Sequence, residues 1–81
     1  MPTETHTIKR YPNRKLYDTN DSNYVTFVKI AALIRNGVEL SVVDSETGHD
    51  VTAPTLALVL AELAKTDITI SADDLVRLIR Q

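Results

Sequence analysis

Hydrophobic and polar residues alternate along two short stretches near the beginning of the chain. The first stretch covers residues 7–11 and the second covers residues 15–19, and a period of two is typical of β-strands. Between them, Pro12 lacks the N–H that a strand ladder needs, and Asn13 tolerates the second central position of a tight turn. The pattern therefore predicts a β-hairpin over residues 7–19.

After a second polar turn, the spacing of apolar residues changes to that of a helix. Residues 27–36 place apolar side chains three and four positions apart, with Thr26 suited to cap the start of a helix and Gly37 suited to end it. β-Branched residues return over residues 40–44, and a glycine-containing turn leads to a short extended stretch at residues 50–52. These features predict one helix followed by a second β-hairpin.

Two further helices are predicted at the end of the chain. The first, over residues 53–65, is apolar on nearly all sides, and such a helix must be covered on more than one face. A connector over residues 66–70 leads to the last helix, which begins after a capping-box pattern formed by Ser71 and Asp74. In so short a chain, a second subunit is the simplest cover for the 53–65 helix.

We therefore expect a homodimer or homotetramer held together through the 53–65 helix. A chain of 81 residues buries a modest part of its surface, and without cysteine it has neither disulfides nor thiolate zinc sites to stabilise it. Self-association is the common remaining source of stability for a chain of this size. The apolar residues expected at the contact are Leu56, Leu58, Val59, Leu60 and Leu63.

Together these elements predict a small α+β domain. It has an N-terminal β-hairpin, a helix, a second β-hairpin and two C-terminal helices, spans residues 7–81, and follows a disordered polar tail at residues 1–6. No window has the long apolar run of a membrane span, and the first residues lack the layout of a signal peptide. We expect a cytoplasmic protein without membrane contact.

Positive charge is concentrated in the first hairpin. The cations there are Lys9, Arg10, Arg14 and Lys15. They are four of the nine lysine and arginine residues, and no Asp or Glu occurs from residue 5 to residue 17. Subtracting these four charges from the formal net charge of −2 leaves −6 for the rest of the chain. An acidic protein with its cations gathered in one segment has a directed basic patch, which favours a polyanion as the partner.

No group of residues has the spacing of a catalytic site. The histidines, His6 and His49, fall in the tail and in a turn, without a nucleophile nearby. Residues 18–23 begin like a calcium-binding loop, but Asn23 stands where glycine is required and Lys29 stands where a bidentate carboxylate is required. A turn in which Asn and Asp side chains bond their own backbone is the preferred interpretation. We expect no enzyme activity, no metal and no cofactor.

The basic hairpin is suited to contact DNA. A two-stranded β-ribbon fits the major groove, where Lys, Arg and Asn side chains reach phosphates and purine edges. A helix-turn-helix formed by the last two helices is rejected, because Asp73 and Asp74 would meet the phosphates. Two structural alternatives remain, namely cations that protect an edge strand from aggregation, and tyrosines that belong to the core.

Several blocks of the sequence together match a pattern known from one bacterial family. The first block, IKRYPNRKLYDT at residues 8–19, is long and distinctive. The later blocks are YVT at residues 24–26, VD at residues 43–44, TG at residues 47–48 and DVT at residues 50–52. The chain thereby resembles the N-terminal domain of bacterial polyhydroxyalkanoate (polyhydroxybutyrate) synthesis regulators. The likeness weakens after Ala53, where the family usually continues with a more polar helix.

The resemblance implies a DNA-binding transcriptional repressor of granule-associated protein genes and polymer accumulation. Its partners would be double-stranded DNA and the surface of the polyhydroxyalkanoate granule. Carried over by position and chosen by charge, the candidate DNA contacts are Lys9, Arg10, Tyr11, Asn13, Arg14, Lys15 and Tyr17. The alternative is a protein-interaction or polymer-granule-binding module that uses the apolar 53–65 helix without direct DNA contact.

Overall fold

The computed structural model describes residues 4–66 and 70–81 and confirms the predicted α+β class. Its elements, in chain order, are β1 (Thr5–Arg10), β2 (Leu16–Asp18), β3 (Asn23–Val25), α1 (Phe27–Arg35), β4 (Glu39–Asp44), α2 (Thr52–Thr66) and α3 (Ala72–Arg80). The predicted connector at residues 66–70 lies largely outside the described residues.

The strands form one four-stranded sheet in the order β3-β2-β1-β4. The first three strands follow one another as an antiparallel meander, whereas β4 returns through α1 to pair with β1 in parallel. In this register Ile8 lies beside Asp18 of β2 and beside Val42 of β4. The strand carrying Lys9 and Arg10 is therefore an interior strand of the sheet.

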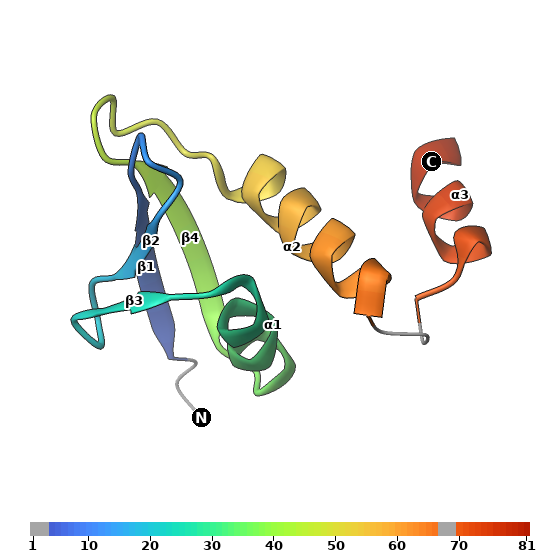
Figure 1. Ribbon diagram of the computed structural model, residues 1–81, viewed down its shortest axis with the longest axis horizontal. Helices are drawn as coiled ribbons and strands as arrows, with labels where there is room; N and C mark the ends of the chain where they lie inside the picture. Colours follow the sequence, from blue (N-terminus) through green and yellow to red (C-terminus); the bar gives the residue numbers. More distant parts are fainter. Residues whose placement is uncertain (1–3, 67–69) are drawn as a thin grey trace.

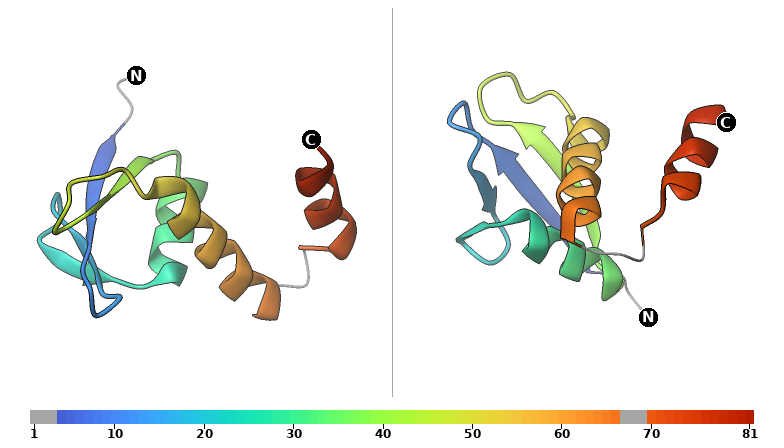
Figure 2. Two further views of the ribbon diagram at one scale, coloured as in Figure 1. Left: turned by 90° about the horizontal axis from the view of Figure 1, so that it is seen from above. Right: turned by 45° about the vertical axis from the view of Figure 1, so that its right-hand side comes forward.

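Both α1 and α2 lie against the same face of the sheet, and the opposite face carries no helix (Figures 1 and 2). The buried core between these layers consists of Ile8, Leu16, Ile30, Ala31, Val42 and Val59. The helix α3 stands clear of the sheet and of the other two helices (Figure 1), and none of its residues is buried. The sheet thus has one packed face and one open face, and the basic hairpin projects from its end.

Local signals set the helix ends as the sequence predicted. The Thr26 side chain accepts a hydrogen bond from the Lys29 N–H at 3.2 Å at the start of α1. Gly37 has a φ of +86°, and the N–H groups of Gly37 and Val38 bond back to α1 carbonyl groups at 3.0 Å each. This is a Schellman ending, which requires the left-handed conformation at the glycine. The predicted capping box before α3 is also present.

The sheet begins earlier than the alternation of residues 7–11 suggested. Thr5 and His6, which the sequence analysis assigned to a disordered tail, belong to β1, and His6 is only 1% exposed. The reason is electrostatic, because the buried imidazole lies between two carboxylate groups. A histidine that has such partners can be buried within a strand.

The second hairpin is shorter than predicted. Its returning arm pairs with β4 only through a bridge between Val43 and Asp50, and the helix α2 already starts at Thr52. The Thr52 hydroxyl accepts a hydrogen bond from the Val42 N–H at 2.8 Å, so a side chain replaces the next strand residue at this edge.

Candidate nucleic-acid interface

A compact turn closes the basic hairpin. The Arg14 N–H donates to the Tyr11 carbonyl at 2.9 Å, and the Tyr11 N–H donates to the Lys15 carbonyl at 3.0 Å. Pro12 and Asn13 occupy the central turn positions as predicted, and the Asn13 side chain accepts a hydrogen bond from the Lys15 N–H at 3.0 Å. Arg14 follows with a φ of +68°. A three-residue loop with a left-handed last residue is a common hairpin geometry, although glycine usually holds that position.

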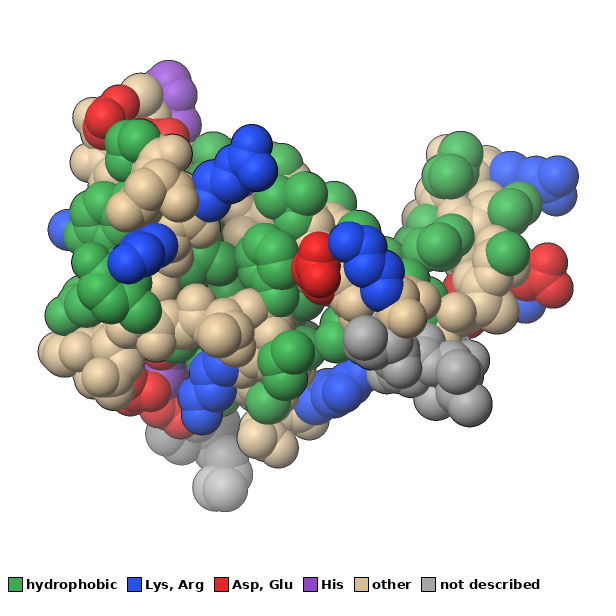
Figure 3. Space-filling view, viewed as in Figure 1, with side chains coloured by type: hydrophobic (Ala, Val, Ile, Leu, Met, Phe, Trp, Pro, Cys, Tyr) green, Lys and Arg blue, Asp and Glu red, His purple; other side chains and the backbone are tan. Residues whose placement is uncertain are grey.

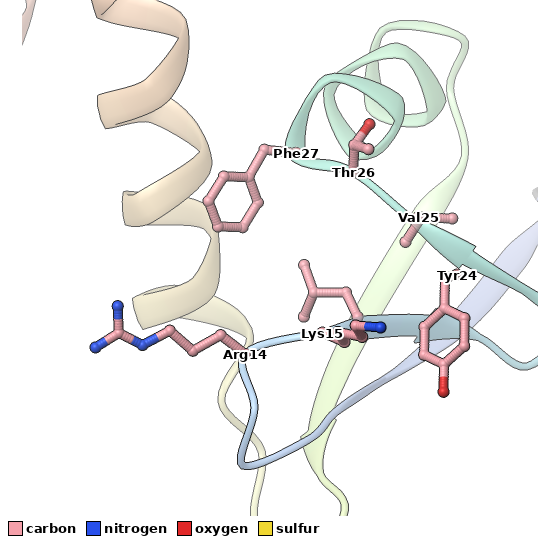
Figure 4. A pocket seen from close by; sticks show the side chains of 7 residues that line it. Arg14, Lys15, Tyr24, Val25, Thr26 and Phe27 are labelled. Carbon is pink, nitrogen blue, oxygen red and sulfur yellow. The ribbon is translucent and has the colours of Figure 1, made fainter.

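The cations of this hairpin point to different sides. Lys9 and Lys15 lie on the open side of the sheet, where Lys15 approaches Tyr24. Arg10 lies on the packed side, half-buried, and its Nη1 is 3.5 Å from the Thr55 hydroxyl on α2. Arg14 extends toward α2, away from Lys15 (Figure 4). Within residues 4–66 and 70–81, none of these four cations forms an ion pair with a carboxylate.

Two hollows lie beside the hairpin tip. One has a volume of about 460 Å³ and is lined by Arg10 and Arg14 together with residues of α2 such as Thr55 and Glu62. The other, of about 380 Å³, is a shallow groove between Arg14 and Lys15 on one side and residues 24–27 on the other (Figure 4). On the view in Figure 3, lysine and arginine side chains on the part formed by the sheet stand apart from one another, with apolar side chains between them.

The open face of the sheet carries a row of aromatic and basic residues. Lys9 pairs with Tyr17, and Tyr17 pairs with Tyr24, so their side chains project from the same face. The Tyr17 and Tyr24 rings meet edge to face at 5.3 Å, and the Tyr11 ring lies 6.5 Å from that of Tyr24. The Lys15 Nζ is 5.4 Å from the centre of the Tyr24 ring. The tyrosines therefore form a cluster beside the Lys15 ammonium, on the face that also carries Lys9.

The seven residues proposed as DNA contacts lie in three different surroundings. Lys9, Tyr11, Lys15 and Tyr17 come together on the open face, whereas Arg10 and Arg14 extend toward α2 and the Asn13 side chain is used within the turn. Tyr24 was not among the residues proposed as DNA contacts. The signal that could have identified it is its place in a short extended stretch directly after the polar turn.

The residues expected at the oligomer contact also divide between two surroundings. Val59 is buried in the core, and Leu56 and Leu63 pack against it. Leu60 is half-buried, and Leu58 remains 43% exposed. One side of α2 is therefore covered by the chain itself, through α1 and the sheet, and Leu58 is the most exposed member of the predicted set.

A buried ion pair lies at the far end of β1 from the basic turn. His6 Nδ1 donates to Asp18 Oδ2 at 2.6 Å and His6 Nε2 donates to Glu4 Oε1 at 2.8 Å, which makes His6 an imidazolium. The bond to Asp18, followed by the bond to Glu4, raises the pKa of His6 above its ordinary 6.5, although burial acts in the opposite direction. The pair holds the strands β1 and β2 together within the sheet.

Asp18 is fully buried, and its carboxylate is completely satisfied. Burial acts to raise the pKa of Asp18, but the hydrogen bonds from His6 and from the N–H groups of Asn20 and Asp21 outweigh it and hold that pKa below 3.8. Those backbone bonds, at 2.9 and 3.3 Å, form the self-bonded turn that the sequence predicted.

One set of potential metal ligands occurs among the described residues, and it coincides with this ion pair. Donor atoms of His6, Asp18 and Asp21 lie within 4.8 Å of one another. Both ring nitrogens of His6 already bond to carboxylates, however, and Asp18 Oδ1 already accepts two backbone N–H groups. These contacts account for the cluster without an ion.

In the described part of the chain, none of the helices combines the length and the hydropathy needed to cross a lipid bilayer.

The structure is a small α+β domain whose first hairpin carries four cations around its turn. The chain belongs to the family of PHB/PHA accumulation regulator DNA-binding domains, whose model matches residues 7–67. The resemblance inferred from the sequence blocks is thereby confirmed, and α3 lies beyond the matched region.

Two relatives share the matched part of the chain. An uncharacterized protein of Allochromatium vinosum is 40% identical over 55 residues, which cover 68% of this chain and 36% of that protein. A protein of Thiocystis violacea, described as an uncharacterized protein in the phbA 5′ region, is 38% identical over 55 residues, covering 68% of this chain and 40% of that protein. The chain thus spans less than half the length of these relatives. No solved structure matches it.

Proposed function

We propose that this domain binds double-stranded DNA through the β1–β2 hairpin and acts as a repressor of genes for polyhydroxyalkanoate storage and granule-associated proteins. The observation that carries the proposal is the placement of the four hairpin cations on both sides of the sheet at its turn end, without ion pairs to carboxylates among the described residues. The turn lies beyond the part of β1 that pairs with β4, and a turn that enters the major groove meets phosphates on both sides, so cations on both sides are favourable there.

The backbone at Arg14 also supports a functional role for the tip. Its φ of +68° places a non-glycine residue in the left-handed region, which costs on the order of 1 kcal/mol. Glycine would remove that cost but would also remove a guanidinium from the hairpin turn. An arginine at a position that favours glycine fits a side chain retained for contact with a partner.

The proposal predicts a loss of DNA affinity when the tip cations are removed. In the double variant Arg14→Ala with Lys15→Ala, two phosphate contacts are lost, so the slope of log K against log salt should become shallower by about 2. The measurement is an electrophoretic shift series on a storage-gene promoter fragment at several salt concentrations. Alanine is as strained as arginine at a positive φ, so the turn itself should change little.

The matched control removes two cations elsewhere. Lys29→Ala with Arg77→Ala changes the net charge equally, and both positions are exposed and helical. This control should keep the salt slope within experimental error, and circular dichroism should show that all variants are folded. Equal salt slopes for the two double variants would mean that DNA affinity depends only on the net charge of the protein, and the hairpin proposal would be wrong.

We further propose that the domain functions as a homodimer or homotetramer. The supporting observation is the exposed apolar surface of α2 and α3, where Leu58, Val76, Leu78 and Ile79 are 43%, 40%, 55% and 82% exposed. Leu58→Glu is expected to shift the sedimentation coefficient to that of a monomer, whereas the neighbouring exposed Ala57→Glu should have little effect. A wild-type chain that sediments as a monomer would contradict the proposal.

The same variants test the alternative, a module that binds proteins or the polymer granule without DNA contact. On that reading the Arg14→Ala, Lys15→Ala variant keeps its full capture by polymer particles and the wild type shows no salt-sensitive DNA shift. Loss of capture in Leu58→Glu would then assign the function to the apolar surface.

A further inference from the structure

We propose that Tyr24, which lies outside the basic segment, positions the Lys15 ammonium for the polyanion, so that the open face of the sheet is part of the DNA-binding surface. This inference rests on the proposed function and deepens it. Tyr24 belongs to the edge strand β3 and lies directly opposite Tyr17.

Burial in the core does not explain why residue 24 is aromatic. Its side chain is 62% exposed, so it contributes little to the core. Instead, the Lys15 Nζ lies 5.4 Å from its ring centre, within the range of a cation–π contact. The Tyr17 ring meets it at 5.3 Å with an interplanar angle of 77°, which is the edge-to-face arrangement that aromatic pairs prefer. Tyr17 therefore supports the Tyr24 ring from one side, and the Lys15 ammonium contacts that ring.

A braced lysine binds a phosphate at a lower entropic cost. A free lysine side chain loses conformational entropy when it is fixed. The Tyr24 ring restricts the Lys15 stem before DNA arrives, which leaves the ammonium free to donate, because a ring face accepts charge without occupying its N–H groups in strong bonds. Tyr24 is therefore a positioning residue.

The charge of this face fits a polyanion near the turn. Lys9 stands in the same cross-strand row as Tyr17 and Tyr24, and Lys15 lies beside that row. The register assigns two carboxylates to this face: Glu39 pairs with Thr5 at the opposite end of β1, and Asp50 pairs with Val43, on the side of Lys9 away from Tyr24. We infer that a phosphate backbone lies across the turn-proximal half of the open face.

The test is a double-mutant cycle on DNA affinity. Tyr24→Leu should weaken binding about two- to five-fold, the size expected for an exposed cation–π contact, whereas Tyr24→Phe should bind like the wild type because the ring remains. In a Lys15→Ala background, Tyr24→Leu should cause no further loss. As an independent readout, the upfield ring-current shift of the Lys15 Hε protons in NMR spectra should persist in Tyr24→Phe and vanish in Tyr24→Leu.

The outcomes separate this inference from the proposed function. If Lys15→Ala binds DNA as tightly as the wild type while the Arg14→Ala, Lys15→Ala variant is weakened, Lys15 does not contact DNA and the inference is overturned, whereas unchanged binding of the double variant makes the hairpin proposal itself wrong. If Lys15→Ala is weakened but Tyr24→Leu binds like the wild type, or if the two losses are additive, then Tyr24 does not act through Lys15 and the inference is overturned.

Discussion

Replacing Asp18 with alanine is expected to destabilise the domain by about 3–5 kcal/mol, the usual cost of removing one partner of a buried ion pair. Asp18 is fully buried and bonds to His6 at 2.6 Å, so the substitution leaves a buried imidazole with one carboxylate fewer. It also removes the acceptor of two backbone N–H groups in the following turn. Because small domains have only about 5–15 kcal/mol of stability, thermal unfolding followed by circular dichroism should show a melting temperature many degrees lower.

The control for this prediction is Asp21→Ala in the same turn. Asp21 is exposed, and its contact with Asp18 is a hydrogen bond donated by the backbone N–H of residue 21, which alanine keeps. Its effect should therefore stay within about 0.5 kcal/mol. Equal melting temperatures for Asp18→Ala and the wild type would show that the pair does not hold the two strands together.

The pH dependence of unfolding provides a second readout of the same pair. The folded-state pKa of His6 is raised. Its contribution to the free energy of unfolding is therefore complete below pH 6.5 and is lost as the pH rises through the folded-state pKa. The folded-state pKa of Asp18 is lowered, so its contribution is complete above 3.8 and is lost as the pH falls through the folded value. The pair should contribute fully between these limits. The loss of stability on the alkaline side should be smaller in Asp18→Asn, because the bond to Asp18 contributes most to the raised pKa of His6 while the bond to Glu4 remains.

The substitution Ile30→Ala is expected to cost about 2–5 kcal/mol, because it leaves a cavity in the core. Ile30 is fully buried and lies in the cluster that joins α1 to the sheet through Ile8 and Val42. The measurement is urea denaturation, in which the midpoint should fall while the slope m stays constant.

Val28→Ala on the same helix is the matched control. Val28 is 69% exposed, and alanine is the better helix former, so its effect should lie within about 0.5 kcal/mol of zero. Comparable losses in the two variants would mean that α1 does not pack on the sheet through the side that carries Ile30.

Much of the fold could be predicted because its signals are local. Thr26 and Gly37 set the ends of α1 through bonds to residues within one helical turn. Pro12 and Asn13 specify the hairpin turn in the same way, through their own backbone preferences. Signals of this kind depend on neighbours in the sequence, so they can be recognised without knowledge of the tertiary structure.

The parts that could not be predicted depend on residues far apart in the chain. The burial of His6 requires Asp18, twelve positions later, although continuing the alternation of Ile8 and Arg10 back by two residues would have placed His6 on the packed face. The parallel pairing of β1 with β4 follows from the crossover through α1, and no local pattern encodes it.

The same limit applies to the candidate interface. Charge density identified the basic hairpin, and strand alternation already places Lys9 and Lys15 on one face and Arg10 on the other. The extension of Arg10 toward Thr55 depends on the position of α2, which no local pattern encodes. The row that joins Lys9, Tyr17 and Tyr24 depends on cross-strand register, which a single residue of slip would have changed.

The interior position of β1 affects how the nascent chain can assemble. The meander of β1, β2 and β3 joins neighbours in sequence, but the other edge of β1 receives its partner only when residues 39–44 arrive. During synthesis, β1 therefore presents unpaired N–H and C=O groups until β4 leaves the ribosome, and an open edge of this kind can pair with another chain. Translation speed across the α1 and β4 codons should consequently influence the yield of correctly folded protein.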